Sequence, residues 1–204
     1  MTLGCDIVVF DFDGTLVESN AIKSEGYDVI AARYSGGPEA MRDARAIPGA
    51  DRYTVADRFA ALLGLPEAEG ARIAEDYTRL VDDRVTVAPE MPGATVLLET
   101  LRGLGADLRV SSATPLVSLE RIVDARGWAH HFDGLHGRPA TKPETLRRLI
   151  GEHGVAPGRI VVVGDGEDDR DSAAECGARF FAVGDRLSGC RLYALDELRE
   201  VLTQ

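Results

Sequence analysis

Short, unbroken apolar runs that end at polar residues alternate along this chain with segments whose apolar positions recur at helical spacing. Residues 7–10 read Ile-Val-Val-Phe, and residues 160–163 read Ile-Val-Val-Val. Apolar runs of this length, rich in β-branched residues, are typical of strands that are buried on both faces of a parallel sheet. The pattern predicts further strands at residues 107–111, 132–136 and 179–183.

Amphipathic helices are predicted between these strands. Their apolar residues recur every three or four positions, and Gly or Pro marks most of their ends. The predicted ranges are residues 94–104, 115–125, 142–153, 168–176 and 196–202. A regular alternation of strand and helix indicates right-handed crossovers and a parallel sheet covered by helices on both faces. The expected fold class is therefore α/β, with a Rossmann-like parallel-sheet core.

The alternation is interrupted directly after the first strand. Residues 18–87 contain helical patterns but no convincing strand. Helices are predicted there at residues 18–34, 51–63 and 66–83. The Ser-Gly-Gly-Pro run at residues 35–38 is interpreted as the end of the first of them. We therefore expect a core domain of residues 1–17 and 88–204, into which a small all-helical cap domain of residues 18–87 is inserted.

Composition and charge exclude several classes of partner. With 45% hydrophobic and 28% charged residues the chain is an ordinary globular protein, and its formal net charge of −11 disfavours nucleic acid, which needs a basic surface. No apolar stretch approaches the about 20 residues of a membrane helix, and no secretion signal precedes the first strand. Cys5, Cys176 and Cys190 show no CxxC spacing, so we expect reduced thiols in a cytoplasmic protein.

Polar side chains gather where three predicted strands end. Asp11 and Asp13 follow the first strand, Ser112 follows the second, and Asp165 follows the fourth, with Asp169 close behind. Because the carboxyl ends of parallel strands meet at one edge, these side chains are expected to converge. Two carboxylates 4 Å apart repel by roughly 4 kcal/mol at an effective dielectric constant of 20, so a cation or a proton must offset the repulsion. One acid alone is compatible with a helix cap; their joint occurrence favours a site.

Four motifs in chain order carry a resemblance to a known family. Residues 11–19 read Asp-Phe-Asp-Gly-Thr-Leu-Val-Glu-Ser, Ser112 ends the second strand, Lys142 stands in Thr-Lys-Pro, and Gly164-Asp165 is followed by Asp169. With these motifs the sequence resembles the haloacid dehalogenase superfamily, in its phosphatase branch, over essentially the whole chain. The insert after the first motif resembles the small helical cap of the phosphoglycolate phosphatase and β-phosphoglucomutase relatives.

The resemblance implies catalytic roles for four residues. Asp11 would attack phosphorus and become an aspartyl-phosphate. Asp13 would protonate the leaving group and then deprotonate the water that cleaves this intermediate. Ser112 would hydrogen-bond a phosphoryl oxygen, and Lys142 would neutralise Asp11 and the phosphoryl group as a point charge.

The resemblance also implies Mg²⁺ as the cofactor, which accords with oxygen-only ligation by carboxylates. Its ligands would be Asp11, the backbone carbonyl of Asp13, and Asp165. Asp168 and Asp169 compete for the last position of the fourth motif, and the spacing from Asp165 favours Asp169.

Candidate substrate-binding residues also follow from the resemblance. Ala113 stands where many relatives carry Asn, so substrate contacts there are expected to differ. Residues 48–52 read Pro-Gly-Ala-Asp-Arg, which resembles the Gly-x-x-Arg cap loop that binds a substrate's distal anionic group. Arg52 is therefore a candidate, although an exposed arginine at a helix start gives the same pattern. Asn20 and Lys23, near the predicted hinge, are further candidates.

We therefore expect a cytoplasmic, Mg²⁺-dependent phosphomonoester hydrolase that acts on a small phosphorylated metabolite, as a monomer or homodimer. A phosphomutase of the β-phosphoglucomutase type stays open, because sequence does not tell whether the aspartyl-phosphate meets water or a sugar phosphate. A phospho-acceptor signalling domain is disfavoured by the helical insert. A dehalogenase is disfavoured by Asp13, since a departing halide needs no proton, and an inactive binding protein by the intact motifs.

Overall fold

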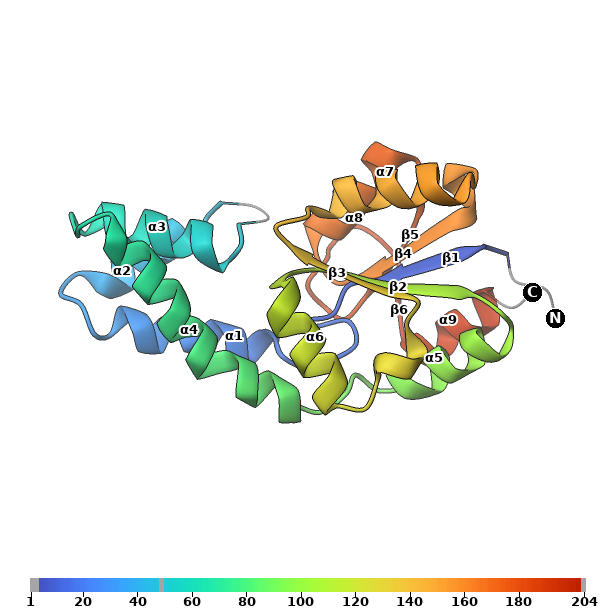
Figure 1. Ribbon diagram of the computed structural model, residues 1–204, viewed down its shortest axis with the longest axis horizontal. Coiled ribbons are helices and arrows are strands. Elements are labelled where there is room, and N and C mark those ends of the chain that lie inside the picture. Colours follow the sequence, from blue (N-terminus) through green and yellow to red (C-terminus); the bar gives the residue numbers. More distant parts are fainter. Residues whose placement is uncertain (1–3, 48–49, 203–204) are drawn as a thin grey trace. The chain divides into compact units, whose positions relative to one another are not determined.

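The computed structural model describes residues 4–47 and 50–202, and the chain divides into two compact units. The α/β unit comprises Met1–Glu18 and Pro89–Gln204, and the cap unit comprises Ser19–Ala88 (Figure 1). No helix in the described part of the chain is long and apolar enough to cross a membrane. The three cysteines, all of them described, are free thiols.

The α/β unit is organised around one parallel sheet, which in the described residues has the strand order β3-β2-β1-β4-β5-β6. The strands are β1 (Ile7–Phe10), β2 (Asp107–Pro115), β3 (Gly134–Arg138), β4 (Ile160–Gly164), β5 (Arg179–Val183) and β6 (Leu192–Tyr193). The order reverses between β1 and β4, the position at which doubly wound sheets bind their ligands. The expected α/β, Rossmann-like core is confirmed.

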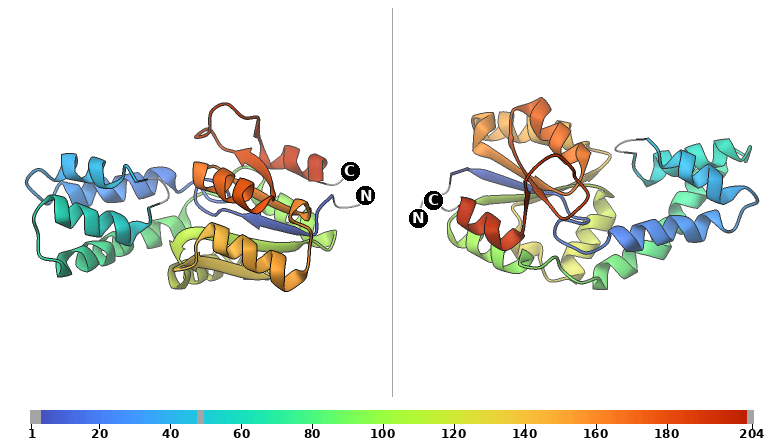
Figure 2. Two further views of the ribbon diagram at one scale, coloured as in Figure 1. Left: turned by 90° about the horizontal axis from the view of Figure 1, so that it is seen from above. Right: turned by 180° about the vertical axis from the view of Figure 1, so that it is seen from behind.

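Helices cover both faces of this sheet. They are α5 (Ala94–Gly103), α6 (Leu116–Ala125), α7 (Lys142–His153), α8 (Glu167–Cys176) and α9 (Leu195–Leu202). Ile7 and Val9 of β1 pack in one cluster with residues of α7 and α8, and alternation along the strand directs Val8 and Phe10 to the opposite face. Figures 1 and 2 show α7 and α8 on one side of the sheet and α5 and α9 on the other. All four β1 side chains are buried, which explains why this strand is apolar throughout.

Two of the predicted strands differ by two or more residues from their predicted bounds, and the short strand β6 was not predicted. β2 does not end at Ser111 but continues to Pro115, because its pairing with β3 resumes after an irregularity and joins Pro115 to Arg138. β3 begins at Gly134 rather than at residue 132, because a short 3-10 turn at Ala129–His131 precedes it. The longer β2 places the whole Ser-Ser-Ala-Thr segment at the carboxyl edge of the sheet.

The cap unit consists, in the described residues, of the helices α1 (Asn20–Ala31), α2 (Gly37–Ala44), α3 (Arg52–Leu62) and α4 (Ala68–Val87). Their buried faces form one core, to which Ile30, Met41, Phe59, Ile73 and Val81 contribute. The ring of Tyr27 on α1 stacks on that of Tyr77 on α4, with the ring centres 4.1 Å apart. The predicted cap helices therefore pack into an apolar core of their own.

Helix α2 was not predicted. The Gly-Gly-Pro run was interpreted only as a helix end, but it also begins α2, with Pro38 in the first turn and Glu39 just after it. Both are helix-start signals, because proline fits the first turn and a carboxylate interacts favourably with the helix dipole. Burial of Ala40, Met41 and Ala44 on one face then stabilises this short helix.

Candidate active site

The first strand delivers two carboxylates to the edge of the sheet. The backbone N–H of Asp11 donates to the carbonyl oxygen of Val163 at 2.8 Å, so the β1–β4 ladder extends to this residue. Asp13 follows, and Gly14 then adopts a φ of 82°, which only glycine takes up readily. The N–H of Gly14 donates to the oxygen of Val17 at 2.8 Å and closes a tight loop. Asp11 and Asp13 are both buried, at 6% and 8% exposure.

Three buried carboxylates converge at this edge, as the strand-end pattern suggested. One oxygen each of Asp11, Asp165 and Asp169 lies within 4.8 Å of the others. Gly164 makes the approach of Asp169 possible, because a Cβ at that position would lie 2.2 Å from the Cγ of Asp169. The backbone N–H of Gly166 donates to Asp169 Oδ2 at 3.1 Å and fixes its carboxylate.

Lys142 is a buried cation in contact with this cluster. Its Nζ lies 3.1 Å from Asp11 Oδ1, 2.6 Å from Asp169 Oδ1 and 2.8 Å from Asp168 Oδ2. Thr141 caps helix α7 in a capping box with Glu144, so that Lys142 is the first residue of the helix. Asp169 belongs to the buried cluster, whereas the side chain of Asp168 is 38% exposed and contacts Lys142 from outside it.

Burial and crowding perturb the ionisation of these groups. Burial raises the pKa of Asp11 well above its usual range; Lys142 opposes this rise, and the neighbouring carboxylates add to it. Burial, with a further contribution from the Asp168 carboxylate, raises the pKa of Asp169 to about 6 against the attraction of Lys142. Burial alone would lower the pKa of Lys142, but Asp11, Asp169 and Asp168 together raise it well above its usual value. Lys142 is therefore a permanent positive charge.

The side chain of Asp13 contacts hydroxyl groups, whereas those of Asp11 and Asp169 contact Lys142. Thr114 Oγ1 donates to Asp13 Oδ2 at 3.0 Å, and Ser112 Oγ lies 3.5 Å from the same oxygen. Ser112 Oγ also accepts the backbone N–H of Thr114 at 3.1 Å. Ala113 is half-buried between them. Thr114 was missed in the sequence, yet the signal was present, because residues two apart on a strand share one face.

Arg186 is a second residue that the sequence did not indicate. It lies beyond β5, and its Nη1 is 3.2 Å from Asp165 Oδ2. The side chain of Asp165 is 3% exposed and that of Arg186 is 57% exposed, so the arginine contacts the cluster from the solvent side. Neither spacing nor periodicity distinguishes Arg186 from a loop arginine, and only the fold brings it to the carboxylate.

The donor set suits Mg²⁺. The clustered side chains offer oxygen atoms alone, which is the ligation that Mg²⁺ prefers over softer nitrogen and sulfur donors. Lys142 is shared among three carboxylates, and buried carboxylates are costly unless further positive charge lies beside them. Asp11, Asp165 and Asp169 therefore fit a divalent cation in both chemistry and charge.

The cap candidates lie elsewhere in the chain. Asn20 and Lys23 are in the first turn of α1 and are half-buried. Pro48 and Gly49 of the Gly-x-x-Arg segment lie outside the described residues. Arg52 begins α3, where Asp51 accepts the backbone N–H of Thr54 at 2.8 Å and caps the helix.

Arg52 is buried within the cap rather than exposed at a helix start. Its Nη1 donates to Asp82 Oδ1 at 3.0 Å and to Thr78 Oγ1 at 2.8 Å. The side chains of Arg52 and Asp82 are 4% and 2% exposed. The guanidinium also lies over the ring of Tyr77, 5.3 Å from its centre. These contacts join α3 to α4; a contact between Arg52 and substrate stays a prediction.

Replacement of Arg52 by alanine is expected to destabilise the protein by about 3–5 kcal/mol, because it leaves the charge of Asp82 buried without this partner. Urea unfolding of Arg52→Ala measures the loss, and Arg58→Ala, an exposed α3 arginine, is the matched control. A stable Arg52→Ala protein that fails only with substrates carrying a distal anion would instead support the substrate-binding role.

The chain resembles known proteins over most of its length. A sequence model of the haloacid dehalogenase-like hydrolases matches residues 5–177. A phosphoserine phosphatase of Halobacterium salinarum is 32% identical over 176 residues, which cover 80% of this chain and 79% of the relative. A phosphoglycolate phosphatase of Synechococcus elongatus is 26% identical over 178 residues, which cover 86% and 82%. The resemblance expected from the four motifs is confirmed.

A solved structure supports the fold. The β-phosphoglucomutase of Clostridium difficile superposes with a TM-score of 0.74 at 16% identity, and the match covers 95% of this chain and 93% of that one. At this level of identity the likeness describes the architecture of the two chains alone.

Proposed function

Because this chain belongs to the family of haloacid dehalogenase-like hydrolases, we propose that it is a Mg²⁺-dependent phosphatase that hydrolyses a small phosphorylated metabolite through an aspartyl-phosphate. The observation that carries the proposal is the contact of Lys142 Nζ with Asp11 Oδ1 at 3.1 Å, inside a buried cluster of carboxylates. The matches to phosphatases of phosphoserine and phosphoglycolate support the substrate class.

Asp11 is the nucleophile in this proposal. A carboxylate oxygen of Asp11 attacks phosphorus, the bond from phosphorus to the ester oxygen breaks, and the phosphoryl group passes to Asp11. Lys142 remains protonated and balances the negative charge of Asp11 and of the incoming phosphate. Ser112, near the carboxyl end of β2, donates its hydroxyl hydrogen to a phosphoryl oxygen.

Asp13 is the general acid and base. Its protonated carboxyl gives a proton to the departing ester oxygen, so that the leaving group departs as a neutral alcohol. The resulting carboxylate then takes a proton from water, whose oxygen attacks phosphorus and releases phosphate and the Asp11 carboxylate. The hydroxyl of Thr114, 3.0 Å from Asp13 Oδ2, holds this side chain in place through both steps.

A magnesium ion would be held by Asp11, Asp165 and Asp169 and by the backbone carbonyl of Asp13. When bound, it offsets the repulsion between carboxylate and phosphate and stabilises the charge on the transferring group. Asp169 also keeps Lys142 in contact with Asp11, because one lysine bridges both carboxylates.

The proposal is tested by a phosphatase screen over phosphorylated metabolites, with and without Mg²⁺. Phosphate release is expected only with the metal, and EDTA is expected to abolish it, because Lys142 and the largely exposed Arg186 do not by themselves balance the charges of the acid cluster and the incoming phosphate. Ca²⁺ is expected to inhibit, since it favours more ligands and looser geometry than Mg²⁺. Full activity after exhaustive EDTA treatment would contradict the metal dependence. A requirement for a sugar bisphosphate, without net phosphate release, would indicate a phosphomutase instead.

A further inference from the structure

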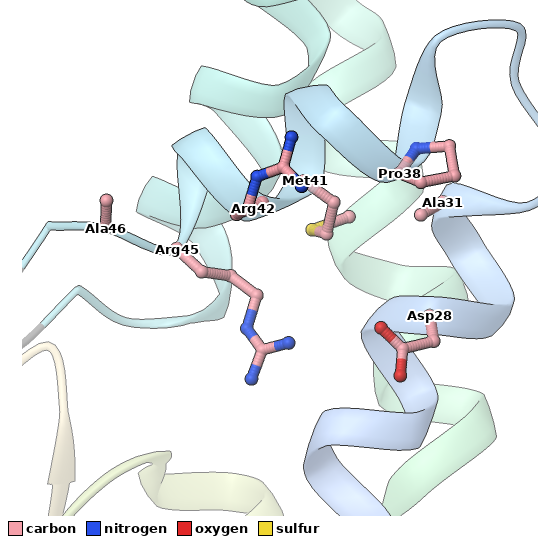
Figure 3. Close-up of a pocket in the computed structure, with 7 residues that line it drawn as sticks. All are labelled: Asp28, Ala31, Pro38, Met41, Arg42, Arg45 and Ala46. Atoms are coloured by element: carbon pink, nitrogen blue, oxygen red, sulfur yellow. The ribbon is translucent and has the colours of Figure 1, made fainter.

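A hollow in the cap unit and the loop after β5 both carry arginines that the proposed chemistry does not use. The hollow has a volume of about 490 Å³, and Asp28, Arg42 and Arg45 are among its lining residues (Figure 3). Figure 3 shows the guanidinium groups of Arg42 and Arg45 on different sides of α2, so they do not hold one anion together. Arg186, in the loop after β5, differs from them because it contacts a buried carboxylate of the acid cluster.

The backbone after β5 sets the position of Arg186. Gly184 follows the strand with a φ of 72°, in the left-handed region that favours glycine. A Cβ at Gly184 would lie 3.5 Å from the Cβ of Asp165 and 3.5 Å from the carbonyl oxygen of Gly14, so the chain runs closely past the acid cluster here. On the other side of Arg186, Leu187 is buried at 5% exposure and anchors the loop. Arg186 therefore lies beside Asp165 because both of its neighbouring segments are fixed.

Each of the three clustered carboxylates has a cation beside it. Lys142 Nζ lies 3.1 Å from Asp11 Oδ1 and 2.6 Å from Asp169 Oδ1, whereas Arg186 Nη1 lies 3.2 Å from Asp165 Oδ2. The two cations differ in exposure, because the side chain of Lys142 is 12% exposed and that of Arg186 is 57% exposed. Lys142 is therefore held in the interior, but Arg186 can turn its long side chain toward solvent, where water hydrates its charge.

We propose that Arg186 competes with Mg²⁺ for Asp165 and so sets the Mg²⁺ concentration at which the acid cluster is loaded. The inference rests on the metal site of the proposed function. Two effects act in the same direction. Asp165 must weaken its contact with the guanidinium in order to ligate a metal, and two positive charges on one carboxylate repel each other. By linkage, a bound ion weakens the contact between Arg186 and Asp165 by the same factor by which the arginine weakens ion binding.

The first experiment titrates the metal-free, full-length protein with MgCl₂ in a calorimeter at constant ionic strength. Arg186→Gln is expected to bind Mg²⁺ about three- to tenfold more tightly than the wild type, which combines the value of a partly exposed ion pair with the repulsion between the two cations. Arg191→Gln is the matched control, because it removes the same charge from the same loop. Arg191 is exposed and lies over the ring of Tyr193, 4.5 Å from its centre, so its replacement should leave the affinity unchanged.

A conservative variant separates the charge of Arg186 from the shape of its loop. Arg186→Lys keeps the positive charge but lacks the planar fork of donors that fits a carboxylate. Its affinity for Mg²⁺ is therefore expected to lie between those of the wild type and Arg186→Gln. Equal affinities of Arg186→Lys and Arg186→Gln would show that Arg186 acts through the shape of the loop, which contradicts a competition between charges.

The second experiment needs no variant. Phenylglyoxal modifies arginine side chains that are accessible, and peptide mapping by mass spectrometry reports the modification of each arginine separately. In the wild-type protein, saturating Mg²⁺ is expected to raise the labelling rate of Arg186 severalfold over the rate in EDTA, because the arginine is released from Asp165. The labelling rate of Arg191 should stay constant.

The proposal is overturned if Arg186→Gln binds Mg²⁺ no more tightly than the wild type, if Arg191→Gln has the same effect, or if Mg²⁺ leaves the labelling of Arg186 unchanged. Weaker binding by Arg186→Gln would show that the arginine instead orients Asp165 for the metal. Absence of Mg²⁺ binding in both the wild type and Arg186→Gln contradicts the metal site of the proposed function itself. The failure of that function is thereby distinguished from a failure of the competition alone.

Discussion

Replacing Asp11 with asparagine is expected to lower turnover of every phosphomonoester substrate by about 10⁴–10⁶-fold, the range seen when a catalytic nucleophile or its partners are removed. The amide is nearly the same size as the carboxylate, but it cannot form the acyl phosphate. Steady-state phosphate release measures the loss. Rapid quenching of the wild-type protein with a ³²P-labelled substrate, followed by peptide mapping, shows which residue carries the phosphoryl group. A label on any residue other than Asp11 would contradict the assignment.

The fold is expected to survive this substitution. A carboxyl group whose pKa is higher in the folded than in the unfolded state lowers the stability of the fold once the pH exceeds the unfolded-state pKa. Burial raises the folded-state pKa of Asp11 in this way. The neutral amide should therefore keep or increase the free energy of unfolding at neutral pH, which urea denaturation in EDTA measures. Asp6→Asn is the matched control. Asp6 pairs with Arg159 at the exposed opposite end of β1, so its replacement should leave turnover unchanged.

Replacing Asp13 with asparagine is expected to slow the hydrolysis of alkyl phosphates by about 10²–10⁴-fold, the usual value of general acid–base help. With p-nitrophenyl phosphate, the rate of the first chemical step, transfer of the phosphoryl group to Asp11, should fall far less, because p-nitrophenolate departs without a proton. Stopped-flow measurement should therefore show a burst of p-nitrophenolate, followed by slow turnover, since attack by water still lacks its base.

Measurement of Mg²⁺ affinity distinguishes the role of Asp11 from that of Asp13. Asp13→Asn should keep its affinity for Mg²⁺, because the metal ligand predicted at this position is a backbone oxygen, whereas Asp11→Asn should bind the ion more weakly. Calorimetric titration with Mg²⁺ compares the two proteins. Equal slowing of alkyl and aryl phosphates in the burst phase would argue against a general acid at Asp13.

The convergence of the acid cluster followed from the sequence by one physical rule. Apolar runs buried on both faces indicate parallel strands, and parallel strands bring their carboxyl ends to one edge. Asp11 and Asp165, which directly follow β1 and β4, were therefore expected to meet there, and one oxygen of each lies within 4.8 Å of the other. Lys142 was identified only through the family resemblance, and the structure places it at the start of α7, which Thr141 and Glu144 cap.

The sequence predicted helix and strand bounds less well where the same residues fit both the end of one element and the start of the next. Gly37 and Pro38 can end one helix or begin the next, and only the burial of Met41 against the cap core makes α2 a helix. The extension of β2 to Pro115 likewise depends on pairing with β3, a contact between distant parts of the chain.

Side-chain partners were decided by the tertiary structure alone. Arg52 was expected to be available to a substrate, but the fold places Asp82, thirty residues along the chain, against its guanidinium. Arg186 reaches Asp165 across 21 residues of sequence, and Thr114 reaches Asp13 across 101. Sequence periodicity reports which face a residue occupies, and it therefore located the acidic edge of the sheet. It does not report which charge lies opposite, because that depends on the packing of elements that are far apart in the chain.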